Sequence, residues 1–224
     1  MEIIARIHNG YESKFGVPRQ SGLVEAVIST VVFEKKYRVP EALRGLEDFS
    51  HIWLIWAFDR AERADWSPTV RPPRLGGNRR MGVFATRSPY RPNALGLSCV
   101  RLLGVEMGDE GPVLKVAGAD LMDGTPIYDI KPYLPYADCH LEAAGGFTDE
   151  TAKRRVRVVI PGEIRKGIDD ARLDALEAVL REDPRPAYQE DPKRVYAFEF
   201  DGMHVRFRAE EGILTVLSIE KLRD

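Results

Sequence analysis

The first 140 residues of the chain contain a series of short apolar segments separated by turn sequences, with no long stretch of helical periodicity between them. Ile52–Phe58 is continuously apolar and too short for most helices, which predicts a strand buried on both faces. Further strands are predicted at Ile3–Ile7, Val24–Phe33, Val83–Thr86, Leu97–Val105 and Val113–Ala117. This pattern is typical of an antiparallel sheet or barrel and not of alternating βαβ units, so we expect a mainly β protein with a barrel-like N-terminal part.

A glycine-rich segment at 143–146 marks the best domain boundary, and we expect one domain over residues 1–142 and a second over residues 150–224. In the second part, Asp170–Arg181 has apolar residues at three- and four-residue spacing, which predicts an amphipathic helix capped by Asp169 or Asp170. Asp201-Gly202 lies between two alternating segments and predicts a β-hairpin. Strands are predicted at Val156–Ile160, Val195–Phe200, Met203–Phe207 and Ile213–Ile219. The second domain is therefore expected to be a small α+β unit.

Residues 71–101 contain seven arginines and no aspartate or glutamate, whereas the whole chain has a net charge of −2. The rest of the chain therefore carries a net −9, and this arginine block is a local excess of positive charge that attracts anions. Arg71-Pro72 and Gly76-Gly77 predict that much of the block is loop held in a fixed shape, as binding sites often are. The alternative is a solvated surface, although such a face would normally interleave Glu and Lys.

The remaining composition narrows the class of protein. The two cysteines lie 40 residues apart and the four histidines are scattered, so no metal site and no disulfide framework is predicted. The N-terminus lacks the apolar stretch of a signal peptide, and no 18-residue apolar run occurs, so we expect a cytoplasmic protein without a membrane span. Gly77–Gly82 has the glycine spacing of a phosphate loop but is followed by Val83-Phe84, and no dinucleotide-binding glycine motif occurs.

Three further segments are polar and stiffened by proline or glycine. Phe15–Gln20 ends in a glutamine that can donate and accept at once, which suits an adenine edge. Asp123–Pro126 is a rigid turn that could hold a purine edge or an amino-acid moiety, or could be a plain turn. Tyr133 and Tyr136 could stack on bases, although from the residues alone we favour packing at a domain edge.

Several of these stretches resemble the TsaA-like family of tRNA methyltransferases. The resemblance lies in FGVPRQ, LEDFSHIWLIWAF, VRPPRLGGNRRMGVFATRSPYRPNALGLS and LMDGTPIYDIKPYLPYAD, and REDPRPAYQ resembles the second domain of the bacterial members. It implies a β-barrel-like domain that binds S-adenosylmethionine without a Rossmann fold, in a homodimer with the cofactor near the subunit interface. It also implies methylation of N6 of N6-threonylcarbamoyladenosine at tRNA position 37, next to the anticodon, particularly in threonine tRNA.

The resemblance also assigns residues. It places cofactor contacts on Pro18, Arg19, Gln20, Asp59, Arg60, Arg87, Leu97, Asp123, Gly124, Thr125 and Pro126. Asp59-Arg60 stands where the family commonly has His-Gln. Contacts to tRNA and to the threonyl carboxylate are expected from Arg71, Arg74, Arg79, Arg80, Arg91, Tyr133 and Arg185. The general base is not identified, and the candidates are Asp123, Asp129 and Tyr133.

Two other functions compete with a tRNA methyltransferase. A non-catalytic RNA-binding module would use the arginine block with Tyr133 and Tyr136, and would bind RNA in a salt-sensitive way without affinity for S-adenosylmethionine. An enzyme acting on a small anionic metabolite would bind the cofactor but not tRNA. The C-terminal unit favours a tRNA enzyme, because a small-molecule enzyme has no need of it.

Overall fold

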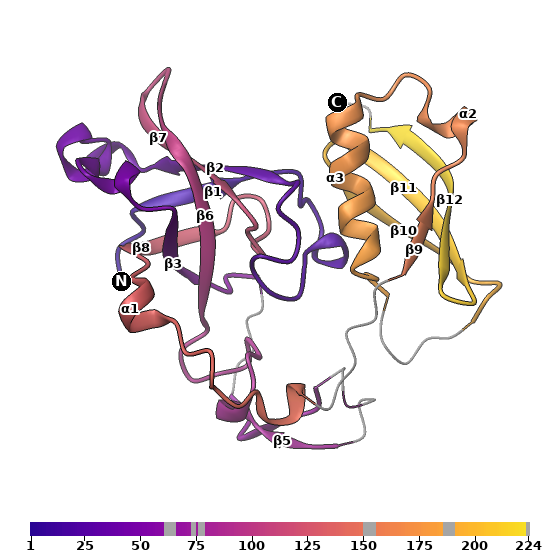
Figure 1. The fold of residues 1–224 in the computed structure, drawn as a ribbon, viewed down its shortest axis with the longest axis horizontal. Coiled ribbons are helices and arrows are strands. Elements are labelled where there is room, and N and C mark those ends of the chain that lie inside the picture. Colours follow the sequence, from indigo (N-terminus) through magenta and orange to yellow (C-terminus); the bar gives the residue numbers. More distant parts are fainter. Residues whose placement is uncertain (61–65, 73–74, 76–78, 150–155, 186–190, 223–224) are drawn as a thin grey trace.

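The protein is mainly β, with a barrel and a smaller sheet lying side by side (Figure 1). The computed structural model describes residues 1–60, 66–72, 75, 79–149, 156–185 and 191–222. Six strands form a closed barrel in the order β1-β2-β7-β6-β3-β8, and every pair of neighbours is antiparallel. The barrel strands are β1 Ala5–His8, β2 Ile28–Phe33, β3 His51–Ala57, β6 Leu95–Gly108, β7 Gly111–Ala117 and β8 Pro126–Pro132. These strands confirm the expected antiparallel barrel.

The barrel core is built from alternate residues of each strand. In β3, Ile52, Leu54 and Trp56 point inward and are buried, while the residues between them are partly exposed. The expectation that this strand is buried on both faces is therefore wrong, because a barrel gives each strand one inner and one outer face. β8 was not expected as a strand, and it begins and ends with proline where the lost N–H costs least.

The long connection between β3 and β6 carries most of the arginine block. It contains two short paired strands, β4 Thr69–Val70 and β5 Met81–Gly82. The strand expected at Val83–Thr86 is wrong, since Val83–Ala85 forms a 3-10 turn. Arg91 holds this turn by donating to the carbonyls of Val83 at 3.2 Å and Thr86 at 2.7 Å.

The C-terminal part is a four-stranded sheet covered by a helix, as expected. Its strands pair in the order β10-β11-β12-β9, with β9 parallel to β12. Asp201 and Gly202 have φ of 50° and 69° and make the turn between β10 and β11. Asp169 caps the helix by accepting from the N–H groups of Ala171 and Arg172. The elements are β9 Arg157–Val159, β10 Val195–Phe200, β11 Met203–Glu210, β12 Ile213–Lys221, α2 Gly162–Arg165 and α3 Asp170–Arg181.

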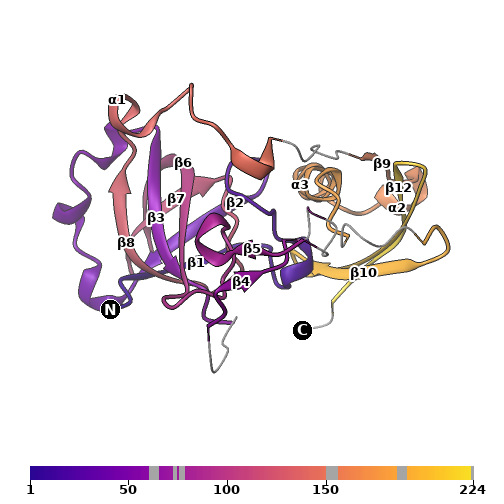
Figure 2. The same cartoon turned by 90° about the horizontal axis from the view of Figure 1, so that it is seen from below.

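Short helical turns complete the fold. Figure 2, seen from below, shows α3 along its axis, and Figure 1 shows β5 beyond one end of the barrel. None of the helices in the described residues is long and apolar enough to cross a membrane. Besides α1 Pro135–Asp138, single 3-10 turns occur at Lys14–Gly16, Lys35–Tyr37, Pro40–Leu43, Leu46–Asp48, Val83–Ala85 and Gly146–Thr148.

The segment between β1 and β2 joins the two parts of the molecule. Tyr11, Val24 and Val27 from this segment are buried in the same apolar core as α3 and the C-terminal sheet. The N–H of Asp201 donates to the carbonyl of Gly10 at 2.9 Å, which ties the β10–β11 turn to the start of the segment. The barrel and the C-terminal sheet therefore share an interface formed by one continuous loop.

Gly96 lets Trp56 lie across β6. A Cβ on Gly96 would come within 2.1 Å of the Trp56 ring, which is buried in the barrel. We expect Gly96→Ala to lower the free energy of unfolding by about 1–3 kcal/mol through overpacking, measured by urea denaturation. Gly82→Ala is the matched control, because nothing lies within 4 Å of its Cβ position. Equal stability of the two variants would contradict this account of the barrel core.

Candidate functional site

Three loops that carry expected cofactor contacts are tied together at one end of the barrel. The N–H of Gly124, before β8, donates to the carbonyl of Ile7 in β1 at 2.8 Å. The N–H of Asp123 donates to the carbonyl of Tyr11 at 2.9 Å, so this loop also lies against the β1–β2 segment. Phe58, directly after β3, donates to the carbonyl of Ala94 at the start of β6 at 2.9 Å.

The Asp123–Pro126 turn has the fixed shape that its sequence predicts. Gly124 has a φ of +77°, a conformation that favours glycine, and Thr125 is 3% exposed. The Thr125 hydroxyl donates to the carbonyl of Met122 at 2.7 Å and closes the turn. The turn therefore presents its backbone groups in a constant arrangement.

Arg60 lies over this turn. One of its guanidinium nitrogens donates to the carbonyl of Asp123 at 2.8 Å, and Arg6 donates to the carbonyl of Gly124 at 2.9 Å. Asp59, next to Arg60, is exposed. Asp59-Arg60, the pair that departs from the family pattern, thus places the Arg60 guanidinium in contact with the Asp123–Pro126 turn.

The carboxylate of Asp123 is held by its neighbours. It accepts from the backbone N–H of Asn9 at 3.1 Å and lies 3.2 Å from Nδ1 of His8. The Asn9 side chain in turn donates to the carbonyl of Leu121 at 3.1 Å. Of the three candidate bases, Asp123 is the one within the turn expected to contact the cofactor.

Gln20 joins the β1–β2 segment to the arginine block. Its side-chain oxygen accepts a hydrogen bond from Arg87, and its amide nitrogen donates to the carbonyl of Arg19 at 2.5 Å. Arg19 itself is exposed and donates to the carbonyl of Arg185 at 3.1 Å, while Pro18 is buried. Two expected cofactor contacts that lie 67 positions apart in the sequence are therefore in direct contact.

Asp120 is a half-buried carboxyl beside these residues, and it was not among the residues that the sequence predicted to contact a ligand. It accepts from the Ser98 hydroxyl at 2.5 Å, and that hydroxyl accepts from the Trp56 indole N–H at 2.9 Å. Burial raises the pKa of Asp120 above its ordinary value of 3.8, while the Ser98 hydrogen bond and the charge of Arg87 act to lower it. An acidic residue flanked by apolar Ala119 and Leu121 is the sequence signal that could have identified it.

The other expected residues on the barrel lie on its outer face. Leu97 is 55% exposed and pairs with Ile55 of β3. Asp129 is paired with Lys131 at 2.9 Å on the same face. Tyr133 packs against the ring of Trp53 at 5.8 Å, and its pKa is raised, which disfavours the phenolate. Asp129 and Tyr133 are thus engaged by partners on this face.

The expected tRNA-contacting arginines fall into two groups. Arg71, Arg79 and Arg80 are exposed, and Arg80 donates to the Thr69 hydroxyl at 3.0 Å. Arg91 is committed to the turn at 83–86, as described above. The guanidinium of Arg185 forms a two-pronged ion pair with Asp183 at 2.7 and 2.8 Å, and both side chains are 13% exposed. A tRNA contact by Arg185 would have to replace this pair, and Arg74 lies outside the described residues.

Comparison with known proteins covers both parts of the chain. Residues 6–139 match the family described as tRNA-methyltransferase O N-terminal domain, and residues 163–222 match the TrmO C-terminal domain. The chain is 40% identical over 227 residues to the tRNA (adenine(37)-N6)-methyltransferase of Escherichia coli K12, covering 98% of this chain and 97% of that protein. The enzyme of the same name from Eikenella corrodens is 46% identical over 172 residues, or 76% and 97% of the two chains.

A solved structure gives the same result for the fold. The crystal structure of TrmO from Pseudomonas aeruginosa superposes with a TM-score of 0.79 at 32% identity, covering 97% of each chain. The similarity therefore extends through the barrel and the C-terminal sheet together. The chain belongs to the TrmO family, as its resemblance to TsaA-like tRNA methyltransferases implied.

Proposed function

We propose that this protein transfers a methyl group from S-adenosylmethionine to N6 of the adenine at tRNA position 37, in the form of N6-threonylcarbamoyladenosine. The observation that carries the proposal is the nearly full-length similarity to an enzyme named for methylation of adenine 37. The barrel supports the proposal physically, because its loops bring residues expected to contact the cofactor, such as Gln20 and Arg87, together without a Rossmann unit.

The residues at the end of the barrel fit the chemistry of S-adenosylmethionine. That cofactor combines a carboxylate and an ammonium with ribose hydroxyls, an adenine ring and a sulfonium that supplies the methyl group. Arg60 and Arg87 are suited to the carboxylate, and Gln20 can donate to and accept from an adenine edge. Asp120 and Asp123 are suited to the cationic groups. The site therefore offers positive, negative and neutral polar side chains that match the groups of this cofactor.

The protein accelerates methyl transfer mainly by holding the methyl donor and the acceptor nitrogen in the geometry that the reaction requires. Methyl transfer from a sulfonium is an in-line displacement, so correct placement of donor and acceptor accounts for much of the rate. The N6–H of threonylcarbamoyladenosine is acidified by the adjoining urea carbonyl, and a modest base suffices to accept its proton. We assign this role to Asp123, with its carboxylate oriented by Asn9 and His8.

Selectivity for the modified base follows from its threonyl carboxylate. An arginine can pair with a carboxylate through two parallel hydrogen bonds, which a lysine cannot reproduce. Among the described arginines of the block, Arg71 and Arg79 are exposed and have no side-chain partner within the described residues. The block therefore offers guanidinium groups to both the carboxylate and the tRNA phosphates.

We further infer a cytoplasmic homodimer that prefers threonine tRNA. The outer face of β3 and β6 supports dimerisation, because Leu97 and Leu103 are 55% and 42% exposed there. Leu97 is also an expected cofactor contact, which fits a cofactor bound near a subunit interface. The tRNA substrate is used where translation takes place, which supports the cytoplasm.

The reaction is tested by single-turnover transfer from labelled S-adenosylmethionine to threonine tRNA, with and without the threonylcarbamoyl group, followed by nucleoside analysis. We expect methylation of the modified tRNA alone, because only it carries the acidified N6–H and the carboxylate. Tight tRNA binding with no transfer and no cofactor binding would instead identify an RNA-binding module. Cofactor binding without tRNA binding would identify a small-molecule enzyme.

Arginine-to-lysine variants test recognition of the carboxylate. We expect at least one of Arg71→Lys, Arg74→Lys, Arg87→Lys and Arg91→Lys to lose roughly tenfold to a hundredfold in kcat/KM for the modified tRNA, since a charged two-pronged pair is lost. Arg208→Lys, on the exposed face of β11, is the control. Normal turnover in all four variants would rule out two-pronged recognition.

The Asp120→Asn variant tests whether Asp120 binds the cofactor or only stabilises the fold. Because folding raises the pKa of Asp120 above 3.8, its ionised form destabilises the folded protein, and stability falls as pH rises from the ordinary aspartate pKa up through the raised pKa of the folded state. The variant keeps an oxygen for Ser98, so we expect its urea stability at pH 7 to be equal or higher and less dependent on pH.

The same variant should bind S-adenosylmethionine about tenfold to a hundredfold more weakly by calorimetry, since a charge-assisted hydrogen bond is lost. Asp109→Asn, in the exposed β6–β7 turn, is the matched control for charge. Unchanged cofactor affinity in Asp120→Asn would remove Asp120 from the binding site.

A further inference from the structure

Two large aromatic side chains are exposed next to each other in the long connection between β3 and β6. Trp66 is 50% exposed and Phe84 is 70% exposed, with ring centroids 6.2 Å apart and an angle of 28° between the planes. Trp66 precedes β4 and Phe84 follows β5, and the N–H of Val83 donates to the carbonyl of Pro68 at 3.0 Å. Exposed apolar side chains that stand together, unlike scattered ones, mark an interaction site.

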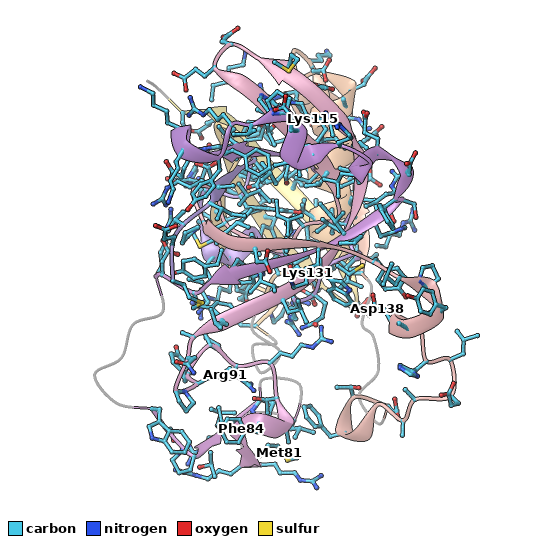
Figure 3. The ribbon with its side chains drawn as sticks, turned by 90° about the vertical axis from the view of Figure 1, so that its left-hand side faces the viewer. Met81, Phe84, Arg91, Lys115, Lys131 and Asp138 are labelled. Carbon is cyan, nitrogen blue, oxygen red and sulfur yellow. The ribbon has the colours of Figure 1, made fainter. Side chains whose placement is uncertain are left out.

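The turn beneath Phe84 is rigid. Val83 is 1% exposed and anchors the turn, while the Thr86 hydroxyl donates to the carbonyl of Val83 at 2.8 Å. The guanidinium of Arg91 lies 5.5 Å from the centre of the Phe84 ring and is itself fixed by two backbone carbonyls. Figure 3 shows Phe84, Arg91 and Met81 together on the segment that hangs from one end of the barrel. Phe84 is therefore held outward before any partner binds.

The positive charge of the arginine block, which contains Phe84, indicates the kind of partner. Arg79 and Arg80 are exposed, Arg80 contacts Thr69 of the same paired strands, and residues 71–101 contain no acidic side chain. Unpaired nucleotides bind to surfaces that combine aromatic rings with cations. The bases stack on the rings, and the cations attract the negatively charged phosphates. The site thus fits single-stranded RNA better than an apolar protein surface.

The aromatic pair is close to the candidate site along the chain. Phe84 precedes Arg87 by three residues, a span of at most about 11 Å, and Arg87 contacts Gln20. An enzyme that modifies a base takes that base out of the stack, which leaves the face of the neighbouring base uncovered. An aromatic surface that covers the exposed face of the neighbouring base would stabilise the tRNA with its target adenine out of the stack.

We propose that Trp66 and Phe84 form a stacking platform for an unpaired base of the tRNA anticodon loop, next to the adenine that is methylated. This inference rests on the proposed function for its tRNA substrate. Arg91 acts from beneath as a positioning residue, and Arg79 and Arg80 are placed to neutralise nearby phosphates. The occupant of the platform is a nucleobase and not a second copy of this chain.

The test uses the full chain and purified threonine tRNA that carries threonylcarbamoyladenosine. We expect Trp66→Ala and Phe84→Ala each to weaken tRNA binding by roughly fivefold to a hundredfold, with an unchanged affinity for S-adenosylmethionine. The slope of log affinity against log salt should stay unchanged, because no phosphate contact is lost. Arg79→Ala or Arg80→Ala should instead reduce that slope by about one.

Two replacements of Phe84 distinguish stacking from simple apolar contact. Phe84→Trp keeps a flat ring and should retain affinity for tRNA, whereas Phe84→Leu keeps apolar volume without a ring face and should lose it. Met107→Ala is the control, because it removes a similarly exposed apolar side chain, 72% exposed, from the β6–β7 hairpin. Quenching of tryptophan fluorescence on tRNA binding should be smaller in Trp66→Phe than in the unaltered protein.

Two results would overturn the platform. One is wild-type affinity for tRNA in the Trp66→Ala/Phe84→Ala double variant or in Phe84→Leu. The other is a loss of tRNA affinity in the double variant that is accompanied by a drop in molar mass to that of a monomer by light scattering, which would make the pair an interface between copies. Failure of the unaltered protein to methylate tRNA would count against the proposed function alone, because the binding measurements are independent of turnover.

Discussion

Apolar packing of the β1–β2 segment against the C-terminal sheet is the constraint on which the candidate site depends. Tyr11, Val24 and Val27 are buried in that core, while Gln20 of the same segment reaches the arginine block. A Cβ on Gly16 would lie 2.8 Å from the Phe198 ring, so this close approach requires glycine. The C-terminal sheet therefore supports the loop that carries Pro18, Arg19 and Gln20, in addition to any contact with tRNA.

The features predictable from sequence are those with a local physical cause. Short apolar segments between turn sequences indicated five of the six barrel strands, all except β8, although not the single buried face of β3. The Asp201-Gly202 hairpin and the Asp169 cap follow from backbone conformations that few residues favour. The Asp123–Pro126 turn was expected for the same reason, and the structure places it beside Arg60.

The features that sequence did not reveal depend on contacts between distant segments. Val83–Thr86 is a short, mostly apolar segment, but so few residues can equally form a 3-10 turn, which here buries Val83 and exposes Phe84. The arginines look equivalent in the sequence, yet Arg91 binds backbone carbonyls and Arg185 binds Asp183. Asp120, in the loop between β7 and β8, acquires its half-buried setting from Ser98 of β6 and Trp56 of β3.

The contact between Arg19 and the carbonyl of Arg185 has a thermodynamic consequence. It fastens the loop that carries the expected cofactor contacts Pro18, Arg19 and Gln20 to the chain just after α3, so this loop keeps its arrangement only while the C-terminal sheet is folded. A ligand that binds the ordered loop and not the disordered one must stabilise that sheet, by an amount that grows with the logarithm of its concentration. Linkage is reciprocal, so a nucleic acid that tightens the C-terminal sheet raises the affinity of the loop by the same factor. Two ligands bound on either side of this contact, one at the loop and one at the C-terminal sheet, would therefore raise each other's affinity without touching.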